Sequence, residues 1–220
     1  MFKICYQHDD FIIVHKPCGV SVHKDEQEIG FTTQLAQQLA VPQLWLVHRL
    51  DKVTSGLLIL ARHANAAATL SQLFATHQIQ KTYIALSTQK PKKKQGLIIG
   101  DMQKARRGAW KLCHSRENPA ITRFHSVSCE PQLRLFILRP QTGKTHQLRV
   151  AMKSIASPIL GDELYQGDVA DRTYLHAYRL QFSYLGQMID VYDLPEHGEF
   201  FQKDTVQQQL NLLVAQHDEC

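Results

Sequence analysis

The stretch "VHRLDKVTSGLLILAR", residues 47–62, places ionisable side chains directly before an apolar run. The run "GLLILAR" (56–62) is short and follows polar residues, so it predicts a buried strand. Asp51 then lies at the edge of the expected core, where its carboxylate loses hydration and needs a cation or hydrogen-bond donors to stay ionised. This arrangement indicates either a structural network or a reaction centre.

The residues after Asp51 favour a tight turn, because Thr54, Ser55 and Gly56 supply hydroxyls, amides and a flexible backbone. An oriented, ionised carboxylate at such a turn can act as a nucleophile or as a general base. The alternative is that Asp51 only caps the turn, since aspartate often bonds to the backbone two residues further on.

Short strands outnumber helices on both sides of this stretch, by the periodicity of their apolar residues. Strands are expected at 56–62, 81–87, 122–129, 133–140, 173–183 and 188–195, together with a strand, a Pro/Gly turn and a second short strand within 10–23. Helices are expected at 32–40, 65–78, 203–217 and within 141–156, where Thr142 or Thr145 can be the N-cap. The predicted class is α+β, with a mainly antiparallel mixed β-sheet flanked by helices in a single domain, residues 1–220.

The composition is that of a globular protein whose core needs no disulfide or metal: 220 residues, 44% of them hydrophobic. Five scattered cysteines without a C-x-x-C pair indicate reduced thiols in a cytoplasmic protein. Twelve histidines show no zinc spacing, so no metal is expected. No apolar stretch approaches about 18 residues, which predicts a protein that is neither exported nor membrane-spanning.

Basic residues concentrate in the segment 90–116, which holds nine Lys and Arg and one acid, Asp101. Its excess of +8 (nine minus one) exceeds the +5 of the whole chain, so the remainder is net acidic. The segment is either a solvated, lysine-protected hairpin or an arm that contacts phosphates. The residues proposed for phosphate contact are Lys92, Lys93, Lys94, Arg106 and Arg107.

A second motif, "TGKTHQLR" (142–149), invites comparison with a nucleotide-binding P-loop. That loop needs a glycine five positions before Gly143, and position 138 is leucine, which excludes an NTPase of this type. Arg149 could pair bidentately with Asp51 and keep it charged, or form an ion pair with another acid.

Six segments, in order along residues 10–182, resemble the RluA family of pseudouridine synthases. "HRLDKVTSG" (48–56) fits the signature H-R-L-D-x-x-T-S-G at every fixed position, and "TGKTHQLRV" is similar to T-G-[RK]-x-H-Q-[IL]-R. The others are "VHKPCGVSVH" (14–23), "KTYIAL" (81–86), "PILGDELYQG" (158–167) and "LHAYRL" (175–180).

The resemblance implies isomerisation of uridine to pseudouridine in tRNA or rRNA, without a cofactor, on the pseudouridine synthase catalytic fold. It implies that Asp51 is the catalytic aspartate, Tyr83 stacks on the target base and Arg149 pairs with Asp51. It implies that Arg49 fills the gap left by a flipped-out nucleotide, and that an apolar wall at Leu148 lies beside the base. A core role for Leu148 is equally open. His48 and Thr54, in the same motif as Asp51, are assigned to substrate binding.

The chain departs from the family pattern at Ala151, where histidine is frequent, and at Lys144, where arginine is commoner. No segment resembles the S4-type RNA-binding domain of many relatives. A stand-alone catalytic domain is therefore expected, acting as a monomer, with RNA recognised by the arm 90–116. Alternatives are a catalytically silent RNA-binding protein or folding chaperone, and a DNA-binding protein, which no helix-turn-helix or zinc-finger pattern supports.

Overall fold

The computed structural model describes residues 2–22 and 30–218, which form two compact units. Unit 1 comprises residues 1–81 and 176–193, and unit 2 comprises residues 82–175 and 194–220. Two residues of the sequence analysis, His23 and Cys220, lie outside the described part. The assignment of 1–220 to a single domain stays a prediction.

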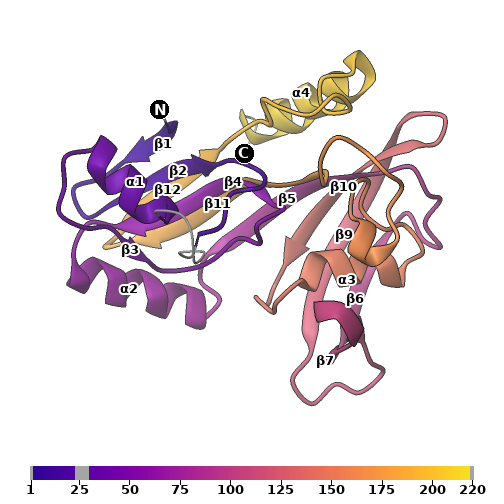
Figure 1. The fold of residues 1–220 in the computed structure, drawn as a ribbon, viewed down its shortest axis with the longest axis horizontal. Coiled ribbons are helices and arrows are strands. Elements are labelled where there is room, and N and C mark those ends of the chain that lie inside the picture. The colour runs from indigo at the N-terminus through magenta and orange to yellow at the C-terminus, as the bar shows by residue number, and fades with distance from the viewer. Residues whose placement is uncertain (1, 23–29, 219–220) are drawn as a thin grey trace. The chain divides into compact units, whose positions relative to one another are not determined.

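Unit 1 is built on a mixed sheet (Figure 1). The strands lie in the order β1 (Ile4–Gln7), β2 (Phe11–Lys16), β4 (Ser55–Ala61), β11 (Leu175–Tyr184), with β3 (Trp45–Leu46) on β4 and β12 (Gln187–Tyr192) on β11. β11 runs parallel to β4, and the other pairs are antiparallel. The buried strand expected at 56–62 is β4, in which all seven residues are buried.

Two helices belong to unit 1: α1 (Phe31–Gln38) and α2 (Ala64–Ala75), near the expected ranges. Ala66 and Leu70 of α2 lie in the same buried cluster as Phe11 and Ile59 of the sheet. The apolar stripe of α2 thus packs against β2 and β4 and covers this part of the core, as its sequence pattern predicted.

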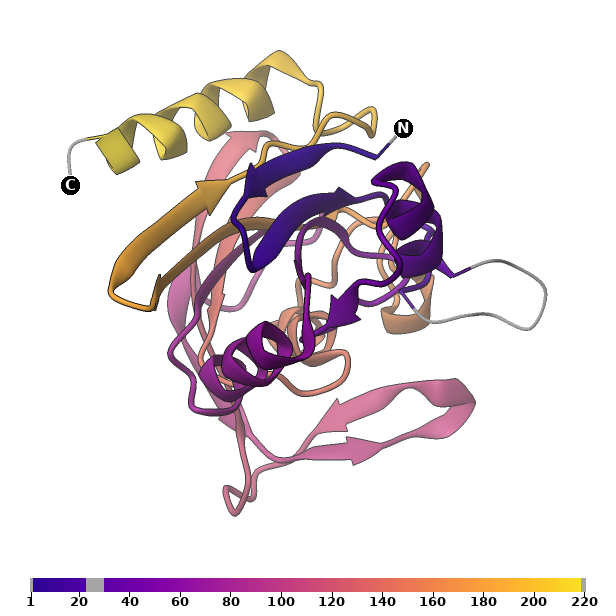
Figure 2. The same ribbon diagram turned by 90° about the vertical axis from the view of Figure 1, so that its left-hand side faces the viewer.

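Unit 2 carries an antiparallel sheet and a separate hairpin. The sheet order is β5 (Gln80–Ser87), β10 (Leu133–Pro140), β9 (Ala120–Glu130), β6 (Gln95–Gly100). The hairpin consists of β7 (Met102–Lys104), the 3₁₀ turn η1 (Arg106–Gly108) and β8 (Trp110–Leu112), and it projects from the rest of the unit (Figure 2). The helical elements are α3 (Gln147–Ser154), η2 (Glu163–Tyr165) and α4 (Asp204–Asp218).

Two sequence expectations are corrected. The N-cap of α3 is His146, in the left-handed conformation (φ 55°), and no side chain caps the helix. Thr142 instead donates to the side-chain oxygen of Gln147 (2.8 Å). The second strand expected before residue 23 is absent from the described residues up to 22. The amide of Gly19 donates to the carbonyl of Lys52 and the thiol of Cys18 to that of Val53, so these groups bond to the connection before β4 and not to a neighbouring strand.

None of the helices in the described ranges is long and apolar enough to cross a membrane.

Candidate active site

Asp51 lies in the short connection between β3 and β4. The amide of Thr54 donates to the backbone carbonyl of Asp51 (2.9 Å) and closes a four-residue turn just before β4 begins. Leu50 and Thr54 are buried (5% and 2% exposed), whereas Asp51 is half-buried. The core thus holds the chain on both sides of Asp51, and the bond that closes the turn does not require its carboxylate.

A buried ammonium group ties a second turn to the Asp51 turn. Lys16, at the end of β2, is 0% exposed, and its Nζ donates to the carbonyls of Pro17 (2.8 Å), Val20 (2.8 Å) and Lys52 (3.3 Å). The amide of Gly19 also donates to the carbonyl of Lys52 (2.8 Å). Burying a cation is costly unless it is hydrogen-bonded. These carbonyls compensate that cost and fix the position of the Asp51 turn.

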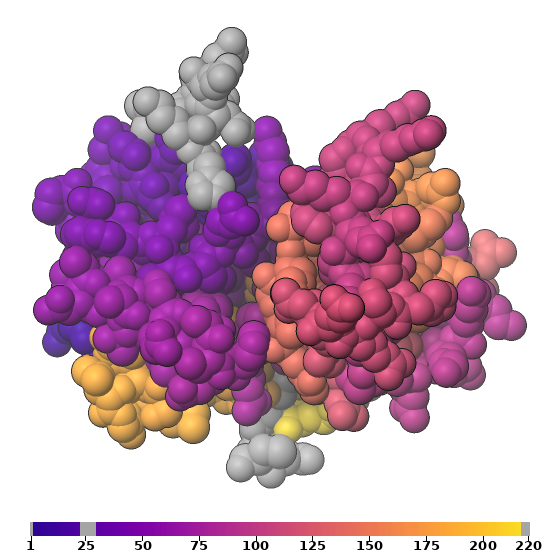
Figure 3. Space-filling model, turned by 90° about the horizontal axis from the view of Figure 1, so that it is seen from below, coloured from indigo at the N-terminus to yellow at the C-terminus, as the bar shows by residue number. Residues whose placement is uncertain are grey.

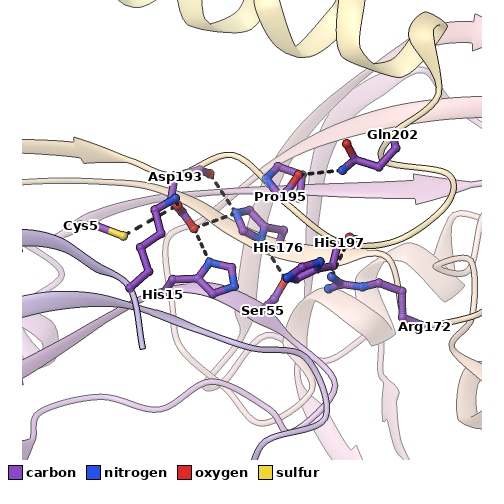
Figure 4. A network of polar contacts seen from close by, with 10 residues as sticks. Cys5, His15, Ser55, Arg172, His176, Asp193, Pro195, His197 and Gln202 are labelled. Atoms are coloured by element: carbon purple, nitrogen blue, oxygen red, sulfur yellow. Dashed lines mark hydrogen bonds and ion pairs between the residues drawn. The ribbon is translucent and has the colours of Figure 1, made fainter. Parts of the chain in front are cut away.

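Buried polar residues also hold the start of β4 (Figure 4). Ser55 lies 2.8 Å from Nδ1 of His176, and Nε2 of His176 lies 2.8 Å from the carbonyl of Asp193. The Asp193 carboxylate contacts His15 (2.6 Å) and accepts from Lys3 (2.8 Å). Burial alone raises the pKa of Asp193, but these bonds and the charge of His176 outweigh it and bring the pKa to about 2. Because Ser55 is 1% exposed, this Ser–His–Asp chain is structural and offers no nucleophile to a substrate.

Steric constraints explain why the T-S-G segment ends in glycine. Gly56 has φ +108°, and a Cβ there would lie 2.3 Å from the carbonyl oxygen of Ala177 on the parallel strand β11. Only glycine fits this approach and this backbone conformation.

His48 faces the interior of unit 1. Its Nε2 accepts a hydrogen bond from the amide of Ile59 (2.9 Å), and its ring stacks on Phe74 (centroids 4.2 Å apart, planes at 22°). Burial, followed by the charge of Lys81, lowers the pKa of His48 to about 3. His48 is therefore neutral at pH 7, and these contacts give it a structural task. Its assignment to substrate binding stays a prediction.

The pKa of His48 makes stability depend on pH. Because the folded pKa is lowered from 6.5 to about 3, the unfolded chain binds a proton that the folded protein does not, and stability falls as the pH drops below 6.5. We expect His48 to account for the loss of about 1–2 kcal/mol of unfolding free energy between pH 7 and pH 5. Urea denaturation of the wild type and of His48→Gln, whose amide oxygen can still accept from Ile59, measures this difference.

His125 is the control for that experiment. Its pKa is also lowered, by burial and then by the charge of Arg139, so the His48→Gln variant should keep part of the pH dependence of stability. His125→Gln should leave the His48 contribution intact. Equal pH slopes for the wild type and His48→Gln would contradict the prediction.

Two other residues of the Asp51 motif, Arg49 and Thr54, differ in their exposure to solvent. Arg49 is exposed, as a residue that reaches into RNA must be. Thr54 is buried, so it contributes to the turn through its amide. The roles of both in substrate binding stay predictions.

In unit 2, Tyr83 lies on the face of the sheet that carries α3. Tyr83 pairs with Leu138, which pairs with Phe124, and directly opposite residues share one face of an antiparallel sheet. Thr122, two residues before Phe124, is on the same face and accepts a hydrogen bond from Gln147 of α3 (3.0 Å). The half-buried Tyr83 and helix α3 are thus brought to one side of the sheet.

Arg149 is held by a carboxylate of its own unit. Its Nε and Nη2 donate to the two oxygens of Asp162 (2.7 and 2.8 Å), and both side chains are buried (7% and 2% exposed). The sequence left open an ion pair of Arg149 with an acid other than Asp51, and the structure contains such a pair. The pairing of Arg149 with Asp51 stays a prediction. Leu148, beside Arg149, is 7% exposed and fits the core role that the sequence left open.

The basic segment 90–116 divides into two groups. The exposed Lys92, Lys93 and Lys94 come just before β6, whereas Arg106 and Arg107 form the exposed tip of the β7–β8 hairpin. Strands β6 and β7 lie between these two groups along the chain, and the arginines stand on a separate hairpin, so the basic segment is not one continuous element. In the view of Figure 3, magenta to pink atoms, the colours of this part of the chain, cover much of the near face of unit 2.

Sequence reasoning missed four buried residues that hold candidate residues within unit 1 (the first and the last of them) or within unit 2 (the other two). They are Lys16, Asp162, Tyr165 and His176. Each lay inside a quoted motif, but a buried polar partner far away in sequence leaves no periodic signal. Within the described ranges, no three His, Cys, Asp or Glu side chains group in a way that could hold a metal ion.

Comparison with known proteins identifies the family. Residues 10–154 match the family model of RNA pseudouridylate synthases. A Haemophilus influenzae protein, "Uncharacterized RNA pseudouridine synthase", is 65% identical over 97% of this chain and 96% of its own length. A Vibrio vulnificus protein, "Dual-specificity RNA pseudouridine synthase RluA", is 34% identical over 82% of this chain and 77% of its own length.

The solved structures agree on the fold. "Human RNA Pseudouridylate Synthase Domain Containing 1" superposes with a TM-score of 0.74 at 24% identity, over 98% of this chain and 95% of that one. The predicted α+β pseudouridine synthase fold is confirmed. This chain belongs to the RNA pseudouridine synthases and, among them, to the RluA family. It is accordingly an isomerase that acts on RNA.

Proposed function

We propose that this protein isomerises specific uridines of rRNA or tRNA to pseudouridine, with Asp51 as the catalytic aspartate. The observation that carries the proposal is the Asp51 turn. Its backbone is fixed by Lys16, by the bond from Thr54 and by the start of β4, yet none of these bonds uses the Asp51 carboxylate. A carboxylate on a turn whose backbone is fixed by its surroundings suits a nucleophile or a general base.

The reaction needs no redox or group-transfer partner. The bond from N1 of uracil to C1′ of ribose breaks, a bond from C5 to C1′ forms, C5 loses its proton and N1 gains one. Nothing is added or removed overall. On our proposal, Asp51 attacks the ribose or otherwise promotes the glycosidic cleavage. Arg149, as the family resemblance implies, pairs with Asp51 and keeps it ionised.

Base flipping is required because the reacting atoms of a stacked nucleotide are out of the reach of an enzyme. A base that is stacked in RNA must leave the stack before an enzyme can reach C1′ and C5. Arg49 is exposed, and its planar guanidinium can stack in the vacated place. Tyr83, half-buried on the α3 side of its sheet, provides a stacking surface for the flipped base, worth about 1–3 kcal/mol.

RNA binding is assigned to the two basic groups of unit 2. Neutralising Lys92, Lys93 and Lys94 to glutamine should weaken RNA binding at low salt and reduce the slope of log Kd against log salt concentration by up to about 2, because each phosphate contact contributes about 0.7 for a single strand. Fluorescence anisotropy over a salt series measures this slope.

Lys203→Gln is the control, because that lysine pairs with Glu130 outside the basic segment and should leave the slope unchanged. An unchanged slope in the triple variant would show that this lysine group is only solvated surface.

The function is tested by mapping pseudouridines in cellular RNA, by selective chemical labelling, with and without the gene. One or a few lost positions in rRNA or tRNA are expected, and purified protein should restore them in RNA from the deletion strain. No lost position, together with intact RNA binding, would favour the silent RNA-binding protein.

A further inference from the structure

The hydroxyl of Tyr165 joins two parts of unit 2 that are far apart in sequence. It accepts a hydrogen bond from the backbone amide of Trp110 (3.0 Å), in β8 of the hairpin. It also lies 2.8 Å from Nδ1 of His146, the N-cap residue of α3. Because the Trp110 amide supplies one proton, the Tyr165 O–H can point to Nδ1 of a neutral His146. The residue is 4% exposed, so water competes little for these bonds.

The ring of the same tyrosine supports Arg149. The guanidinium carbon lies 4.9 Å from the centre of the Tyr165 ring, within cation–π range. The His146 ring meets it edge-on, at 5.8 Å and 87°. Three residues earlier, Asp162 holds Arg149 by two hydrogen bonds. The segment 162–165 therefore fixes Arg149 through a carboxylate and a ring, and reaches the hairpin through the hydroxyl.

The hairpin needs such support. It has two short strands, separate from the main sheet, and an isolated hairpin is marginally stable in water. Its base is fixed where the amide of Cys113 donates to the carbonyl of Asp101 (2.8 Å) and the amide of Asp101 to the carbonyl of Ser115 (2.9 Å). Further out, at the residue that pairs with Lys104, the bond from Trp110 to Tyr165 attaches the hairpin to the rest of unit 2.

We propose that Tyr165 is a positioning residue that couples the RNA-binding hairpin to helix α3 and Arg149. With its hydroxyl bonded to both, the hairpin is held in a defined direction before RNA arrives. Phosphates bound by Arg106 and Arg107 at the tip are then aligned with the helix that carries Arg149. Fixing the hairpin in advance lowers the entropy cost of binding, so its effect falls mainly on RNA affinity. This role rests on the proposed function, because it assigns the hairpin tip to RNA.

Tyr165→Phe tests the anchor, because it removes the hydroxyl and keeps the ring against Arg149. Without RNA, limited trypsin digestion should cleave after Arg106 and Arg107 several times faster than in the wild type. Tyr192→Phe, in the exposed part of β12 in unit 1, is the control and should leave the rate unchanged. An unchanged rate in Tyr165→Phe would overturn the anchor. This readout needs neither RNA nor activity, so it remains decisive if no pseudouridine is formed.

The coupling is tested by combining Tyr165→Phe with Arg106→Gln/Arg107→Gln. In the otherwise wild-type protein, Tyr165→Phe should raise Kd and KM for RNA three- to tenfold and change kcat less than twofold. In the protein that lacks both arginines, it should change Kd less than twofold, because the hairpin tip no longer binds. Equal fold-changes in the two backgrounds would overturn the coupling and leave Tyr165 as a structural residue.

Discussion

Asp51→Asn is expected to lower the rate of pseudouridine formation by at least about 10³-fold, to the limit of detection. The amide has the shape of the carboxylate, but it is neither a nucleophile nor a base under these conditions. The turn is closed by the Asp51 carbonyl and tied to Lys16 through Lys52, so the substitution leaves these bonds in place. The free energy of unfolding and the Kd for RNA should therefore remain close to those of the wild type.

The experiment is a single-turnover assay with tritium-labelled uridine in a substrate RNA, run beside urea denaturation and RNA binding. Asp9→Asn is the matched control, because it makes the same change at an exposed position of unit 1 and should retain full activity. Turnover within tenfold of the wild type in Asp51→Asn would remove Asp51 from the catalytic role. Unfolding or loss of RNA binding in that variant would instead support the cap role that the sequence left open.

The largest expected effect on stability is that of Arg149→Met. Arg149 and Asp162 are both buried, and removing the cation leaves the Asp162 carboxylate without its bidentate partner in a place that water hardly reaches. Breaking a buried pair in this way costs about 3–5 kcal/mol of unfolding free energy. Urea denaturation at pH 7, followed by circular dichroism, measures the loss.

Two further variants separate charge from geometry at this pair. Arg149→Met/Asp162→Leu removes both charges and should recover a large part of the lost stability, since a buried ion pair is often replaceable by apolar residues. Arg149→Lys keeps the charge but loses the bidentate contact, so its stability should lie between those of the wild type and Arg149→Met. A cost below about 1 kcal/mol for Arg149→Met would show that the pair behaves like a surface ion pair.

The sequence predicted those features whose signal is local. The apolar run 56–62 became β4, and the alternating stretches became β5, β9, β10, β11 and β12, because strand periodicity is written in neighbouring residues. The terminal helix expected at 203–217 was found as Asp204–Asp218. The grouping of motif residues around Asp51 also came from one contiguous segment, and the resemblance to the family came from six such segments in order along the chain.

The features that were missed depend on partners far away in sequence. The start of α3 was misplaced because Thr142 bonds to Gln147 and, through Ile121, to β9 instead of capping the helix. Lys16 read as an ordinary motif lysine, although it is buried among three carbonyls. The short strand β1 and the division of the basic segment were likewise invisible, because neither carries a pattern of its own.

That division sets a minimum size for an RNA that uses both basic groups. A strand of six residues, such as β6, is roughly 20 Å long, and one stacked nucleic-acid strand advances about 3.4 Å along its axis per nucleotide. An RNA must then offer a stacked run of about six nucleotides to span β6, the strand that lies between the three lysines and the base of the hairpin. A shorter RNA would then contact only one of the two basic groups. The affinity for RNA should therefore drop in a single step, and not gradually, as the RNA is shortened.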